Sequence, residues 1–176
     1  MLLRRATEDD IPEIERVMRE SIDGISRRTY DAAQVASSLR YVAHLDRELI
    51  SDQTYFVVEE NGEIVGCGGW SARSRLYAGS GSSEGDARKL DPANESARVR
   101  AMFVVPRFER RGIGGMILNA CEDEARRAGF RRAELMAMLS GHEMYLARGY
   151  RDVEKVDARL EDGTPFPLIR MEKGLS

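Results

Sequence analysis

The residues best suited to chemistry lie in a glycine-rich turn, and the chemistry they offer is anion binding. The turn reads Arg110-Arg111-Gly112-Ile113-Gly114-Gly115; it follows an expected strand ending at Pro106 and opens a helix with no acidic residue in its first turn. Free N–H groups and the dipole at a helix start attract anions, and glycines let the backbone approach a phosphate. Arg110 and Arg111 can add charge-assisted contacts. The alternative is a turn that merely joins strand to helix.

Two familiar phosphate-binding patterns do not fit this turn. No Gly-Lys-Ser/Thr follows it, which excludes a Walker turn, and its glycine spacing does not match a dinucleotide fingerprint. The stretch instead resembles the central motif of the GCN5-related N-acetyltransferase superfamily, a strand followed by Gln/Arg-x-x-Gly-x-Gly/Ala. Gly112 and Gly114 match its glycines, and Pro106 and Phe108 match its flanking pattern. Glu109 stands where Gln or Arg is expected, which removes one polar contact.

The resemblance implies a single-domain acyltransferase of bacterial type that uses acetyl-CoA and no metal. It implies an α+β fold of three layers, with a mixed, mostly antiparallel sheet of six to seven strands, splayed central strands and helices on both faces. The pyrophosphate would lie on the glycine turn, and strand backbone would hold the pantetheine arm. The cofactor-binding residues so implied are Met102, Phe103, Val104, Arg110, Arg111, Gly112, Ile113, Gly114 and Gly115.

A second segment carries the expected acid. Residues 144–150 read Met-Tyr-Leu-Ala-Arg-Gly-Tyr and resemble the family's Phe-Tyr-x-x-x-Gly-Phe, with Tyr145 on its tyrosine. In the family this tyrosine sits near the thioester sulfur, and a positioned phenol can protonate a departing thiolate. The resemblance therefore makes Tyr145 the expected catalytic residue; the alternative is a half-buried aromatic of a helix. The resemblance spans about residues 2–173 and is most specific over residues 99–150.

The expected central strand departs from the family where many relatives carry a glutamate base. Arg98 occupies the matching position. Strand alternation puts Arg98 and Arg100 on one face, and two guanidiniums there suit a carboxylate or phosphate on the acceptor. We therefore expect an acceptor amine that also carries an acidic group. The alternative is an exposed edge balanced by Glu95 or Asp91.

Other residues keep more than one role open. Trp70 either walls the acceptor pocket or packs under the loop that follows it. Cys67 and Cys121 are expected in the core, and a covalent acyl-cysteine is a minor alternative. A water chain can remove the amine proton without a base. The candidates for a protein base are Glu134, His142 and Glu143.

Hydrophobic periodicity predicts the elements that position these residues. Strands are expected at residues 2–4, 99–105 and 133–139, with hairpins over 55–70, around Asn61-Gly62, and over 151–171. Helices are expected at 11–22, 31–49, 113–129 and 143–147. The polar stretch 71–96 is expected to be a long loop. A strand-helix-strand unit between two antiparallel hairpins predicts a mixed sheet with helices on both faces.

The bulk composition fits one enzyme domain over residues 1–176. Apolar residues make up 42% of the chain, and none of its apolar runs is long enough to span a membrane. Two cysteines and no signal peptide predict a cytoplasmic protein. A net charge of −3 argues against nucleic acid as a partner. The expected partners are acetyl-CoA and an amine acceptor, and a homodimer is compatible with the sequence. The alternative function is a non-catalytic acyl-CoA sensor.

Overall fold

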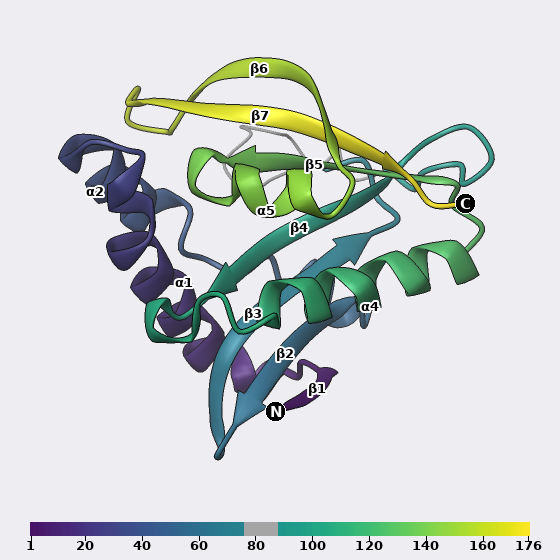
Figure 1. Cartoon of the computed structure of the whole chain (residues 1–176), viewed down its shortest axis with the longest axis horizontal. Helices are drawn as coiled ribbons and strands as arrows, with labels where there is room; N and C mark the ends of the chain where they lie inside the picture. Colours follow the sequence, from purple (N-terminus) through teal and green to yellow (C-terminus); the bar gives the residue numbers. More distant parts are fainter. Residues whose placement is uncertain (76–87) are drawn as a thin grey trace.

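The structure, a computed structural model, describes residues 1–75 and 88–176 (Figure 1). The strands are β1 (Leu2–Arg5), β2 (Tyr55–Glu60), β3 (Glu63–Ser71), β4 (Ala97–Val104), β5 (Arg132–Met138), β6 (Arg151–Arg159) and β7 (Pro165–Gly174). The α-helices are α1 (Ile11–Gly24), α2 (Ala32–Tyr41), α3 (Glu48–Ser51), α4 (Ile113–Arg127) and α5 (His142–Ala147). Short 3₁₀ helices are η1 (Glu8–Asp10), η2 (Ser26–Arg28), η4 (Pro106–Phe108) and η5 (Leu139–Gly141). Among the described residues, no helix is long and apolar enough to cross a membrane.

The described strands form one mixed sheet in the order β1-β2-β3-β4-β5-β7-β6. All neighbours pair antiparallel except β4 and β5, which are parallel. One hydrophobic core lies between the sheet and α1 and α2, and a second lies between the sheet and α4 and α5. The expected α+β fold, with a mostly antiparallel sheet and helices on both faces, is therefore confirmed.

The first hairpin has the turn that its sequence predicts. Asn61 and Gly62 join β2 to β3, and both have positive φ, at 52° and 78°. Two consecutive positive φ values give the tight turn whose twist matches the flanking strands, and Asn-Gly is the pair that adopts it most readily. The C-terminal hairpin, β6 and β7, is also where the sequence predicts it.

The helix expected over residues 31–49 is wrong in its second half. Asp31 caps α2 by accepting from the amide of Gln34, but α2 ends at Tyr41. His44 Nε2 donates to the carbonyl of Arg40 at 2.7 Å, which satisfies an end of α2, and Asp46 Oδ1 accepts the amide of Glu48 at 3.0 Å, where α3 begins. These side chains thus compete with continuation of the helix.

The centre of the sheet opens between β4 and β5. Only Ala97 and Arg98 of β4 are in register with β5, opposite Ala133 and Glu134. Further along, the two parallel strands diverge, as the gap between their ribbons in Figure 1 also indicates. The sheet is thus continuous at one end of this pair and split at the other.

A bulge in β4 lies just past the last paired residues. Ala101 has a φ of 52°, and the register against β3 shifts there. The buried hydroxyl of Tyr55 donates to the Ala101 carbonyl at 2.6 Å. A left-handed alanine is uncommon and needs support from its surroundings, which this hydrogen bond supplies.

Candidate active site

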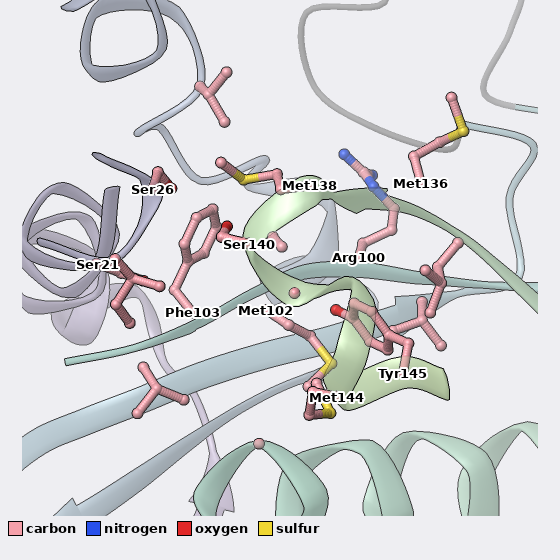
Figure 2. A pocket seen from close by; sticks show the side chains of 18 of the residues that line it. Ser21, Ser26, Arg100, Met102, Phe103, Met136, Met138, Ser140, Met144 and Tyr145 are labelled. Carbon is pink, nitrogen blue, oxygen red and sulfur yellow. The ribbon is translucent and has the colours of Figure 1, made fainter. Parts of the chain in front are cut away.

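A cavity of about 800 Å³ occupies the split between β4 and β5. Its lining comes from β4, the turn before α4, and η5 with α5 on one side. On the other side it is lined by the end of α1, the segment after α2, and the C-terminal hairpin. Figure 2 shows side chains from both sides converging on this space. Residues that are distant in sequence thus share one cavity, as a two-substrate site requires.

The glycine turn forms one end of this cavity. Gly112 is the N-cap of α4 with a φ of 80°, and Met116 N–H donates to its carbonyl at 2.9 Å, the first helical bond. The amides of residues 113–115 precede that bond and so have no partner within the helix. Gly112 carries no side chain, and a Cβ at Gly114 would meet only Met144. The backbone is therefore open to a group such as a pyrophosphate, and these residues fit one.

The two arginines of the turn differ in position. Arg110 lines the cavity. Arg111 does not; it forms a bidentate pair with Glu60 at 2.9 and 3.0 Å, and its guanidinium lies over the ring of Phe108. Glu109, the departure from the family motif, also lines the cavity, and Arg28 binds its carboxylate at 2.8 and 2.9 Å. The charge of Glu109 is thus compensated beside the expected pyrophosphate site.

Tyr145 lies where the split meets the glycine turn. Its ring packs edge-on against Tyr150 at 5.9 Å between centroids. In Figure 2 its hydroxyl points toward the middle of the cavity, between Met102 and Arg100. The side chain is buried, and this burial raises its pKa. The phenol therefore keeps its proton at neutral pH and can donate it.

The structure separates the two arginines of β4. Arg98 turns away from the cavity lining, and its Nη1 pairs with Glu134 at 2.6 Å. Arg100 lines the cavity with only 2% of its side chain exposed, and its Nη1 contacts Asp46 Oδ2 at 3.0 Å. Its Nε has no hydrogen-bond partner among the described residues. The alternative partner expected for these arginines, Glu95, instead binds Arg88.

Asp46 holds Arg100 in this position. Burial alone would raise the pKa of Asp46, but hydrogen bonds from Arg100 and the Glu48 amide outweigh it, so the pKa is lowered. The same carboxylate oxygen lies 3.3 Å from Arg75 Nη1. Two guanidiniums thus share one carboxylate, and of these three groups Arg100 and Asp46 line the cavity.

Of the three candidate bases, only Glu143 is among the residues that line the cavity. Glu143 lines the cavity and is exposed. His142 Nε2 contacts Asp152 at 2.7 Å, and neither His142 nor Glu134 is among the lining residues. Trp70 lies outside the lining too: its indole packs on Phe130 and donates to Glu124 at 3.0 Å. Trp70 thus belongs to the core on the α4 side.

Both cysteines are buried in the core. Neither Cys67 nor Cys121 lines the cavity. Burial raises the pKa of the Cys67 thiol to about 12. A thiol of this kind is not a nucleophile at neutral pH.

Several cavity residues gave no sign of function in the sequence. Ser21 and Ser26 are buried serines at the end of α1 and in η2, and Phe166 and Leu168 come from β7. Arg148, the residue that follows α5, reaches the glycine turn. Of these, only Arg148 had a local signal, since it lies three residues after the expected catalytic tyrosine.

Comparisons with known proteins address the family and the fold. The family model described as the acetyltransferase (GNAT) family matches residues 19–150. No curated protein matches the sequence at a significant level.

Solved structures share the fold across nearly the whole chain. A GCN5-related N-acetyltransferase from Rhodopseudomonas palustris has a TM-score of 0.71 at 16% identity, covering 98% of this chain and 94% of that one. The PaiA N-acetyltransferase from Thermoplasma acidophilum, solved with coenzyme A, has a TM-score of 0.64 at 16% identity, covering 98% of both chains. A ribosomal-protein-alanine N-acetyltransferase from Brucella melitensis has a TM-score of 0.64 at 18% identity, covering 99% of both.

Proposed function

Because the chain belongs to the acetyltransferase (GNAT) family and is an acetyl-CoA-dependent N-acetyltransferase, we propose that it acetylates a primary amine of a small molecule or peptide by direct transfer. The observation that carries this proposal is Tyr145, a neutral phenol facing the cavity between the split strands and beside the glycine turn. A binding module would have no use for a proton donor at this point.

The chain's own residues have distinct duties in this reaction. The amides of residues 113–115 and Arg110 would bind the pyrophosphate, and the backbone of residues 102–104, which has no partner in β5, would bind the pantetheine arm. Acetyl-CoA supplies the activated acetyl group. Tyr145 would give its proton to the thiolate as the C–S bond breaks and the amine nitrogen bonds to the acetyl carbon. The amine proton would leave to water or to Glu143.

We further propose that the acceptor carries an acidic group, which Arg100 receives. Arg98 is excluded from this role because it is bound to Glu134 outside the cavity. Arg100 is held at the cavity by Asp46, and its Nε–H has no hydrogen-bond partner within residues 1–75 and 88–176. Arginine stays protonated at any working pH, so its duty here is binding and not proton transfer. Ser21 and Ser26 offer hydroxyls on the opposite wall.

The test is to incubate the protein with acetyl-CoA and a panel of amines while following the release of free thiol. We expect release that depends on the amine, with amino acids and other acidic amines preferred over neutral amines and spermidine. Calorimetric binding of CoA without thiol release on any amine would instead support the acyl-CoA sensor. The missing strand glutamate and Glu109 are the features that favour this alternative.

A further inference from the structure

Arg148 lies on the glycine turn although it comes from the C-terminal end of α5, where it is the capping residue. Its guanidinium packs over Gly115, the third residue of α4, where a Cβ would overlap Nη2 and Cζ of Arg148. Both residues line the cavity. Because Gly115 is the position that admits this guanidinium, the contact depends on the absence of a side chain there.

This position is electrostatically unfavourable for the protein alone. A helix N-terminus carries partial positive charge, and α4 has no acidic residue in its first turn and no capping side chain that would offset it. Arg148 adds a full positive charge at this point, in a cavity that Arg110 also lines. Neither arginine forms an ion pair within residues 1–75 and 88–176, whereas the neighbouring Arg107 and Arg111 pair with Glu63 and Glu60.

We propose that Arg148 binds the diphosphate of acetyl-CoA from the side opposite the amides of the glycine turn. This rests on the proposed placement of the diphosphate at residues 110–115. An anion between α4 and α5 would accept hydrogen bonds from the free amides and from the guanidinium together, and so turn a repulsive contact into an attractive one. Arg148 is then a binding residue that also ties α5, which carries Tyr145, to α4.

The experiment compares Arg148→Ala and Arg148→Lys with a control, Arg151→Ala. Arg151 is exposed on β6 and pairs with Glu172. By calorimetry at constant ionic strength, Arg148→Ala should weaken CoA binding about 10- to 100-fold, as expected for a lost charge-assisted contact. Arg148→Lys should recover part of the affinity, because lysine keeps the charge but not the planar fork. The control should bind CoA like the parent protein.

A second ligand identifies the group that Arg148 contacts. Dephospho-CoA keeps the diphosphate and lacks the 3′-phosphate, so Arg148→Ala should lose the same factor with it as with CoA. If the loss disappears with dephospho-CoA, the contact is with the 3′-phosphate and the proposal is wrong. Equal CoA affinity in the parent and in Arg148→Ala also overturns it.

Two further measurements distinguish this proposal from a structural role for Arg148 and from failure of the proposed diphosphate site. Thermal unfolding without ligand should show Arg148→Ala to be no less stable than the parent, because the variant removes a repulsion; a structural role for Arg148 predicts a lower Tm. Gly114→Asp should remove CoA binding whether or not Arg148 takes part. If Gly114→Asp binds CoA normally, the proposed diphosphate site is wrong, whatever the result for the Arg148 variants. Binding needs no acceptor, so the outcome is independent of whether turnover is found.

Discussion

At the scale of a single residue, the hydroxyl of Tyr145 has the most direct consequence. Replacing it in Tyr145→Phe removes the proton donor and keeps the buried ring. We expect kcat to fall about 10- to 1000-fold while the affinity for acetyl-CoA is nearly unchanged, as for an acid that acts in the transition state. Steady-state kinetics with calorimetry measures both quantities.

The matched control is Tyr150→Phe. Tyr150 is buried next to Tyr145 but is not among the residues that line the cavity, and its hydroxyl has no hydrogen-bond partner in the described part of the chain. Its loss should leave kcat nearly unchanged. Because burial raises the pKa of Tyr145 above its ordinary value near 10, kcat in the parent should not decline from phenol ionisation below that pH. Undiminished turnover in Tyr145→Phe would make this tyrosine a packing residue.

Arg100 belongs to the same scale. Arg100→Ala should raise the KM for the acceptor and leave that for acetyl-CoA unchanged, since a guanidinium–carboxylate contact can contribute about 1.5–3 kcal/mol. The substitution also leaves Asp46 with Arg75 as its remaining ion partner, which lowers stability.

Arg100→Lys is therefore the second variant, because it keeps a charge beside Asp46. It should rescue the acceptor KM poorly, since lysine lacks the planar fork. Comparing amino acids with their amides as acceptors isolates the acidic group. If the parent protein prefers the amides, Arg100 does not receive an acid.

The positions of single residues were predictable when they depended on local sequence. Gly112 and Tyr145 lie in recognisable turn and helix patterns, and their positions at the cavity agree with those patterns. Asp46 gave no such sign. Its partner Arg100 is 54 residues away, and an isolated aspartate in a polar segment has no local feature that predicts a distant partner.

At the scale of an element, the start of α4 can be tested by adding charge. Gly114 is a better position than Gly112, whose φ of 80° would strain any side chain. Gly114→Asp should abolish CoA binding, because it places a negative charge in the phosphate site. It should also be at least as stable as the parent, since an acidic residue at a helix N-terminus is favourable and aspartate has a higher helix propensity than glycine.

The control for this variant is Gly174→Asp, at a position with open space around it at the end of β7. It should bind CoA normally. Calorimetry gives the CoA affinity and thermal unfolding the stability of the parent, Gly114→Asp and Gly174→Asp, and the two measurements together decide the result. Normal CoA affinity in folded Gly114→Asp would remove the glycine turn from the cofactor site.

The bulge in β4 gives a second test at this scale. Tyr55→Phe removes the hydroxyl that supports the Ala101 carbonyl and leaves that buried acceptor without its donor. We expect the free energy of unfolding to fall by about 1–3 kcal/mol in urea titrations. Since Ala101 lines the cavity, kcat/KM should fall as well. A stability loss with unchanged kcat/KM would limit the bulge to a structural role.

Elements with strong periodicity or turn chemistry were predictable, and those ended by side-chain hydrogen bonds were not. The apolar stripe along one face of α1 and the Asn61-Gly62 turn are both properties of local sequence. The residues after Tyr41 keep helical spacing of apolar side chains, yet His44 and Asp46 bind backbone groups and end the helix. Such competition between side chain and backbone is not visible in hydrophobic periodicity. The expected loop over residues 71–96 falls partly outside the residues that the structure describes.

At the scale of the whole molecule, the split between β4 and β5 divides the sheet into two parts, here called plates. Among the described strands, the plates are joined only by the short paired segment of β4 and β5, here called the hinge. One plate holds β1 to β4 and the other holds β5, β7 and β6, and the plates meet in register at two residue pairs. The pantetheine arm of acetyl-CoA, lying in the split, would contact the backbone of residues 102–104 and fill the space between the two parts of the sheet. We expect CoA to slow hydrogen exchange at the amides of residues 102–104, and exchange at β6–β7 to change little.

Equal protection at these β4 amides with and without CoA would mean that the plates are already fixed. If instead protection appears only with the ligand, the cosubstrate is for a time a structural member of the sheet. The free protein would then be the more compliant form. The enzyme would be stiffest while acetyl-CoA or CoA is bound, and each turnover would relax the sheet again as CoA leaves.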